Sequence, residues 1–236
     1  ITGTAGPTRQ VANIQEGEPL NSFYGYQIVG IWQENDDFSS TVDNVQAGDF
    51  KYLDVNGDKT VNAADRVIIG KSFPDFTYSL TNNFQYKGFG LYIFIEGVQG
   101  VSMLNNNLVD TYFPPNLRRN RLAEPLLNRW TPQNPSNVYP SFVTPNTQGQ
   151  KGVNNYTVED ASYIRLNTVR ISYNLPIKSG PIAGATVYVS GQNLYTITDY
   201  TGFDPALNPN GGANFRMDWN AYPAPRTYLF GATLNF

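Results

Sequence analysis

A strict alternation of side-chain type runs through FTYSLTNNFQY, residues 76–86. The even positions carry aromatic and aliphatic side chains, with Asn82 as the exception, and the odd positions carry only polar ones. A period of two residues is typical of a β-strand, whose successive side chains point to opposite faces. Strands of soluble sheets usually have about five or six residues, whereas about 9–11 residues cross a bilayer when the strand is tilted. The length and the aromatic ends therefore predict a transmembrane β-strand.

Four further segments have strand character. A tight turn at Gly88 predicts a return strand over residues 91–98, and the later segments 161–176, 185–198 and 227–236 are also rich in β-branched and aromatic side chains. In the segment 161–176 the apolar side chains occupy even positions before Asn167 and odd positions after it, which predicts a β-bulge there. The sequence thus indicates an all-β protein.

The connections between these strands alternate in length. Short ones lie near residues 87–90 and 175–184, and long ones cover residues 99–160 and 199–225. Outer-membrane barrels have short periplasmic turns and long extracellular loops. Five strands do not close a barrel, and an open edge in lipid leaves backbone groups without partners, so we expect further strands from outside this sequence.

We accordingly divide the chain into two regions. Residues 1–75 are expected to form an extracellular loop region, and residues 76–236 to form barrel strands with the two long connections outside the cell. The last segment, TYLFGATLNF, places apolar side chains on one face up to the terminal aromatic residue.

The segment DVNGDKTVNAAD, residues 54–65, has the ligand spacing of a calcium loop. Two departures weaken the match, since Lys59 stands where such loops favour glycine and Asp65 stands where they favour a bidentate glutamate. A turn rich in Asp and Asn without metal is the alternative. The candidate Ca²⁺ ligands are Asp54, Asn56, Asp58, Thr60 through its carbonyl, Asn62 and Asp65.

Composition excludes several functions. The chain has no Cys and no His, which excludes thiol chemistry, imidazole zinc sites and a Ser-His-Asp triad within it. The net charge of −3 does not suit a nucleic-acid partner, and nothing marks a catalytic pair of carboxylates. A basic cluster at Arg118, Arg119 and Arg121 is a candidate contact for a partner or an anion, with a solvated loop face as the alternative.

Several stretches together resemble the C-terminal region of the SusC/RagA family of TonB-dependent outer-membrane transporters. They are GEPLNSFYGYQIVGIW, the stretch from GDFKYLDVNGD to IEGVQG, ASYIRLNTVRISYNLP, VYVSGQNLYTITDYTGFDP and YPAPRTYLFGATLNF. They cover nearly the whole chain, and only residues 101–155 look idiosyncratic.

The resemblance implies the last strands of a 22-stranded barrel that imports oligosaccharides or peptides in Bacteroidetes. It implies a SusD-like surface lipoprotein as partner, and TonB–ExbB–ExbD acting through a part outside this sequence. It also implies that the barrel-assembly machinery reads the terminal strand at Tyr228, Phe230, Leu234 and Phe236. A secreted, calcium-stabilised β-sandwich binding module is the alternative, and it would bury the apolar face that a barrel turns to lipid.

Overall fold

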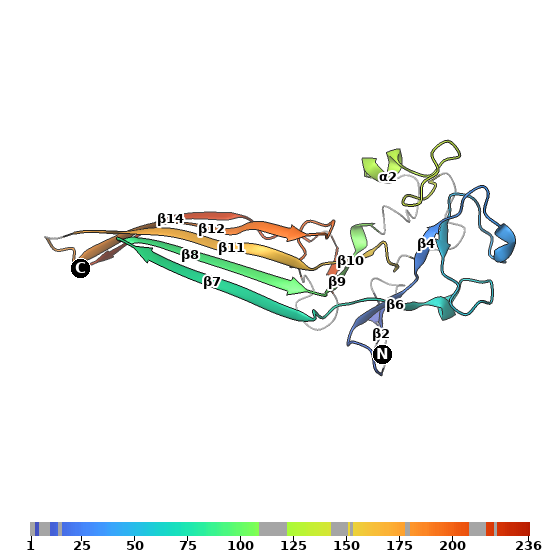
Figure 1. Ribbon diagram of the computed structural model, residues 1–236, viewed down its shortest axis with the longest axis horizontal. Helices are drawn as coiled ribbons and strands as arrows, with labels where there is room; N and C mark the ends of the chain where they lie inside the picture. The colour runs from blue at the N-terminus through green and yellow to red at the C-terminus, as the bar shows by residue number, and fades with distance from the viewer. Residues whose placement is uncertain are drawn as a thin grey trace. The chain divides into compact units, whose positions relative to one another are not determined.

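The computed structural model describes residues 3–4, 10–13, 16–108, 122–142, 151, 153–177, 180–207, 216–219 and 221–236. Regular structure in these residues is almost entirely β, and the chain divides into two compact units (Figure 1). The sheet unit comprises residues 74–101, 161–207 and 222–236. The loop unit comprises residues 1–73, 102–160 and 208–221.

The sheet unit is one antiparallel sheet of five strands in the order β14-β12-β11-β8-β7 (Figure 1). All five segments predicted from the sequence are strands, and the tight turn at Gly88 is also confirmed, since Gly88 has a φ of 86°. The strands are β7 (Phe76–Tyr86), β8 (Phe89–Gln99), β11 (Tyr163–Leu175), β12 (Gly184–Thr198) and β14 (Thr227–Asn235).

The predicted bulge is present at Asn167. Leu166 pairs with Ile95 and Thr168 pairs with Phe94, so β11 has one residue more than β8 at this point. The extra residue reverses the parity of β11, and the apolar side chains on both sides of Asn167 therefore lie on the same face of the sheet. The bulge continues into β12, where Asn193 adopts a left-handed φ of 53°.

The connections at the two ends of the sheet differ in length, as expected. At one end, β7 and β8 are joined by residues 87–88 and β11 and β12 by residues 176–183. At the other end, residues 100–162 and 199–226 form the long connections. Most of each predicted long connection therefore falls in the loop unit, together with the first 73 residues.

The loop unit contains short strands that the sequence analysis did not predict. They form three small sheets in the orders β1-β2-β3-β6, β4-β5 and β10-β9-β13. Their bounds are β1 (Gly3–Thr4), β2 (Gln10–Asn13), β3 (Ser22–Gly25), β4 (Ile28–Ile31), β5 (Phe50–Tyr52), β6 (Val67–Lys71), β9 (Ser102–Asn105), β10 (Val158–Asp160) and β13 (Met217–Asp218). The short helices are the 3₁₀ turns η1 (Phe38–Ser40) and η2 (Ala63–Asp65) and the helix α2 (Ala123–Leu127).

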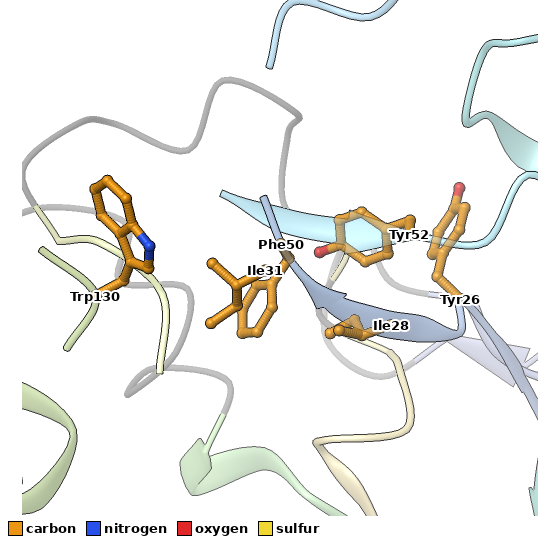
Figure 2. Close-up of a cluster of buried hydrophobic side chains, with 6 residues drawn as sticks. All are labelled: Tyr26, Ile28, Ile31, Phe50, Tyr52 and Trp130. Atoms are coloured by element: carbon orange, nitrogen blue, oxygen red, sulfur yellow. The ribbon is translucent and has the colours of Figure 1, made fainter. Parts of the chain in front are cut away.

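An aromatic cluster forms the larger core of the loop unit. β4 and β5 supply most of its side chains, and Trp130 joins them from the connection that follows α2 (Figure 2). Its six buried members are Tyr26, Ile28, Ile31, Phe50, Tyr52 and Trp130. A second cluster gathers Phe23, Leu104, Val153 and Val158.

Specific hydrogen bonds join distant segments of the loop unit around this core. The side chain of Asn155 accepts a hydrogen bond from the N–H of Ile28 at 2.7 Å and donates one to the carbonyl of Ile28 at 3.1 Å. The indole N–H of Trp130 donates to Oε1 of Gln33 at 2.8 Å. The described parts of the connection between β9 and β10 are thus held against the N-terminal segment at Trp130 and Asn155.

Deleting Asn167 tests the role of the bulge. Without this residue, the positions after it must either present their apolar side chains to the opposite face or slip by one residue against β8. We expect the full-length protein to lose most of its folded barrel, measured as the heat-modifiable band in electrophoresis of outer membranes. Asn167→Ala keeps the chain length and removes two side-chain hydrogen bonds, one donated to Oε1 of Glu96 at 3.0 Å and one accepted from the hydroxyl of Thr168 at 2.9 Å, so it should cost about 2 kcal/mol. Normal assembly of the deletion variant would contradict this account.

Candidate functional site

The two faces of the five-stranded sheet have opposite chemistry. The residues that pair across the strands with the apolar positions of β7 are also apolar. One face of the sheet is therefore apolar apart from Asn82, glycines and Gln99. Its side chains are strongly exposed, for example 56% for Phe84 and 83% for Phe230. The other large exposed members include Phe76, Tyr78, Leu80, Tyr86, Ile164, Ile171, Val189, Tyr195, Ile197 and Leu234. Soluble monomers rarely expose an apolar surface that extends over several strands.

The dimensions of this apolar face match a bilayer. β7 has 11 residues, and a rise of about 3.4 Å per residue gives a length of about 34 Å. A tilt of about 45° reduces its height to about 24 Å, close to the ~25 Å apolar band of outer-membrane barrels. Aromatic residues lie at both ends of the strand, with Phe76 and Tyr78 at one end and Phe84 and Tyr86 at the other, where such barrels carry their aromatic girdles.

Among the described residues, no helix has the length and hydrophobicity needed to cross a membrane.

The opposite face of the sheet is mainly polar, with Phe94, Val98 and Leu229 as apolar exceptions. The odd positions of β7 contribute only Thr, Ser, Asn and Gln, and the paired positions of β11 and β12 contribute mainly the same residue types. The long strands place three charged side chains on this face, namely Glu96, Arg165 and Arg170. A sheet with one lipid-compatible face and one hydrated face is the wall of a transmembrane barrel.

A buried ion pair fixes the first part of the long connection after β12 to the polar face. The guanidinium of Arg165 pairs with the carboxylate of Asp204, and both side chains are more than 90% buried. The Asp204 carboxylate also accepts hydrogen bonds from the backbone N–H groups of Ala206 at 2.9 Å and Ala224 at 3.2 Å. Removing one partner of such a pair typically costs about 3–5 kcal/mol. Sequence reasoning missed this pair, because no local pattern links two residues 39 positions apart.

Three of the four terminal residues predicted to serve in assembly lie on the apolar face. In β14, Tyr228 pairs with Gly191, Phe230 with Val189 and Leu234 with Ala185, all on the apolar face. Their exposed fractions are 65%, 83% and 50%, and Phe236, which follows the strand, is 85% exposed. Their placement agrees with the predicted alternation of the last segment.

The predicted calcium loop lies between β5 and β6, and helices do not flank it. Most of its side-chain oxygens accept hydrogen bonds from backbone N–H groups of the loop itself. Asp54 accepts from Gly57 at 2.7 Å and from Lys59 at 2.8 Å, and Asp58 accepts from Thr60 at 2.8 Å. Lys59, at the position where glycine is favoured, adopts a left-handed φ of 67°. The loop thus has the tight turn of a calcium loop with a side chain at the strained position.

Asp65 is the structural anchor of this loop. Its carboxylate is fully buried and accepts hydrogen bonds from the N–H groups of Val55 at 2.9 Å and Asn62 at 2.8 Å. Burial opposes ionisation, but these backbone donors outweigh burial and hold the pKa of Asp65 below its ordinary value of 3.8. The ionised carboxylate therefore stabilises the loop above that value, and this contribution is lost as the pH falls through the lower pKa of the folded state.

The fit of the loop to Ca²⁺ is partial. The Asp54 carboxyl lies close enough to Asp65 to affect its pKa, and the ammonium of Lys151 acts electrostatically on the same region. Backbone N–H groups and this ammonium already supply positive partners for the carboxylates. In the described part of the chain, no three or more acidic side chains converge as a group able to hold a metal ion. An ion bound here would have to rely on the amide and carbonyl oxygens of Asn56, Thr60 and Asn62 as well.

The basic cluster of Arg118, Arg119 and Arg121 lies outside the described residues.

A pair of neighbouring substitutions tests the assignment of the two faces. Leu80→Lys places a charge at the middle of the apolar face and should lower the free energy of unfolding of the full-length protein in lipid by about 2–4 kcal/mol. Thr81→Lys adds the same charge one residue away on the polar face and should cost less than about 1 kcal/mol. Urea unfolding in lipid vesicles measures both values. Equal costs for the two variants would contradict the assignment.

Comparison with known proteins identifies relatives of this chain. TonB-dependent receptors P3 and P26 of Formosa agariphila are 33% and 34% identical to it, over 97% and 98% of the chain. SusC of Bacteroides thetaiotaomicron is 25% identical over 98% of the chain. The chain spans 23%, 24% and 21% of the lengths of these three proteins. No family model matches the chain.

Solved structures of the RagAB peptide transporter share this fold. The chain superimposes on the open-open state of the RagAB peptide importer with a TM-score of 0.70 and 28% identity, covering 93% of this chain and 23% of that one. A second RagAB structure gives a TM-score of 0.72 with 26% identity, covering 92% and 23%. These relatives are transporters and receptors, not enzymes, and their barrel architecture and the exposed apolar face do not support the β-sandwich alternative. The chain thus matches, over nearly its whole length, a part of the SusC/RagA family of TonB-dependent outer-membrane transporters, and its five long strands form part of a transmembrane barrel.

Proposed function

We propose that this chain forms the last strands of the barrel of an outer-membrane importer that takes up oligosaccharides or peptides. The observation that carries the proposal is the five-stranded sheet, because its apolar face suits lipid and its polar face suits a hydrated lumen. The relatives support it, since one is named SusC and two structures are described as a peptide importer and a peptide transporter, RagAB. The remaining strands would come from the longer polypeptide.

The proposal includes partners outside this chain. A SusD-like surface lipoprotein would deliver the ligand at the extracellular side, where the loop unit lies if the short turns are periplasmic. TonB–ExbB–ExbD would supply energy through another part of the polypeptide. The barrel-assembly machinery would recognise β14 through Tyr228, Phe230, Leu234 and Phe236. A Bacteroidetes-type outer membrane is the proposed setting.

Purification of the native protein from outer membranes in detergent tests this function. We expect a polypeptide of about four times the 26.3 kDa of this chain, because the chain spans 23% of a relative, and we expect a lipoprotein to co-purify with it. Deleting Phe236 should lower the amount of folded protein in the membrane, whereas Asn235→Ala, the neighbouring control, should not. A soluble protein of the chain's own mass, with no membrane association, would overturn the proposal.

We also propose that residues 54–65 bind Ca²⁺ weakly and stiffen the loop unit. The ligand spacing, the turns at Gly57 and Lys59 and the closeness of Asp54 to Asp65 support this proposal. The lysine at the strained position, the shorter Asp65 and the backbone partners of the carboxylates all oppose tight binding. We therefore expect a dissociation constant of about 10⁻⁴–10⁻³ M, as in weak extracellular sites.

Calorimetric titration of Ca²⁺ into the full-length protein in detergent measures this affinity. Asp58→Asn removes one carboxylate from the middle of the loop and should weaken binding by roughly tenfold, since the charge of the ligands sets the affinity. Asp199→Asn, at an exposed aspartate that directly follows β12 in the sheet unit, is the control and should leave binding unchanged. If the wild-type protein takes up no heat-detectable Ca²⁺ at millimolar concentration, the loop is a metal-free turn.

A further inference from the structure

The polar face of the sheet contains a hollow of about 520 Å³. It extends over β7, β8, β11 and β12, with a small contribution from β14, and this volume lies within the usual range of ligand sites, about 300–1,000 Å³. Hydrogen-bonding side chains surround one cation in it. They are Asn83, Gln85, Tyr92, Ser190 and Gln192, and the cation is Arg170.

The guanidinium of Arg170 is held on an aromatic platform. It lies 3.8 Å from the centre of the Tyr188 ring, across the strand pair β11–β12. The Tyr188 ring in turn lies against the backbone of Gly231 in β14, where a Cβ atom would stand 2.4 Å from the ring. The ring is therefore fixed against the wall, and stacking fixes the plane of the guanidinium while leaving its N–H groups free at the edge.

Among the described residues, Arg170 is the charged group of this face that lacks a polar partner. The carboxylate of Glu96 accepts a hydrogen bond from Asn167, and Arg165 is paired with Asp204. In the described part of the chain, the exposed guanidinium of Arg170 has neither an ion pair nor a hydrogen bond, only its contact with Tyr188. A guanidinium presents five N–H donors in a fork that fits a carboxylate in a bidentate manner.

We propose that Arg170, positioned by Tyr188, binds the carboxylate of a ligand in the polar hollow, so that the importer favours carboxylate-bearing ligands. This inference rests on the proposed import function and adds the chemical class of its ligand. The shared chemistry is a carboxylate, which a peptide carries at its C-terminus and an acidic oligosaccharide carries on its uronic acid residues. The amides and hydroxyls around Arg170 provide neutral hydrogen-bonding groups for the rest of a polar ligand.

Uptake by cells that carry the full-length protein as their sole importer of this type tests the inference. The first pair of probes is a set of oligopeptides with free C-termini and the same set as C-terminal amides. The second pair is an oligogalacturonate and the corresponding neutral oligogalactoside. Mass spectrometry of the imported material gives the ratio of carboxylate-bearing to neutral ligand, and the responding pair identifies the source of the carboxylate.

Arg170→Gln should lower this ratio by about tenfold or more, because it removes a charge-assisted hydrogen-bonded pair and keeps a polar side chain of similar length. Arg170→Lys keeps the charge without the fork and should give an intermediate ratio. Lys87→Gln removes a positive charge in the turn between β7 and β8, outside the hollow, and should leave the ratio at the wild-type value.

Two outcomes would overturn the inference while leaving the import function intact. The first is an unchanged ratio in Arg170→Gln. The second is a lowered ratio in Arg170→Gln that comes with a loss of heat stability of the barrel, which would show that Arg170 pairs with another part of the polypeptide. Uptake of neither class of probe by the wild-type protein would instead overturn the proposed import function, and the inference with it.

Discussion

The absence of water in a bilayer forces every backbone N–H and C=O group of a spanning segment to find its partner within the protein. The five long strands meet this requirement between β14 and β7 with antiparallel ladders, and strands from outside this sequence would pair with the two edges. The register of the same ladders determines which side chains share a face. The hydrogen bonds between strands and the separation of apolar from polar side chains therefore depend on each other. The bulge at Asn167 shows how strict the constraint is, because one extra residue in β11 keeps both halves of the strand in phase.

The polar parts of the molecule depend on a second kind of interaction, the pairing of buried polar groups over long sequence distances. Asn155 completes the backbone hydrogen bonds of Ile28, and Asp204 binds Arg165 and two backbone N–H groups at once. Leaving such groups unpaired would cost about 1–3 kcal/mol each, and more for charged ones. Long connections thereby acquire fixed conformations without an extensive apolar core of their own.

The sequence predicts the sheet unit well and the loop unit poorly, for a physical reason. In β7 and β14 one face meets an apolar environment over the whole strand. The polarity of each residue therefore indicates the face on which its side chain lies. β4 and β5 have only four and three residues, and their burial depends on Trp130 and Asn155, more than 75 residues away, so a local period cannot appear. The spacing of residues 54–65 located a tight Asx-rich turn, including the strained position of Lys59. The contact between Arg170 and Tyr188 depends on the register between β11 and β12, which the sequence alone does not predict.

Spin labels at single cysteines along β11 test the central claim most directly, since this chain has no cysteine of its own. Labels placed one at a time at positions 163–173 of the full-length protein in lipid would be probed with oxygen, which partitions into lipid, and with a water-soluble nickel complex. Our account predicts oxygen exposure at positions 164, 166, 169, 171 and 173, with the phase changing at Asn167. An unbroken period of two through position 167, or water exposure on both faces, would contradict it.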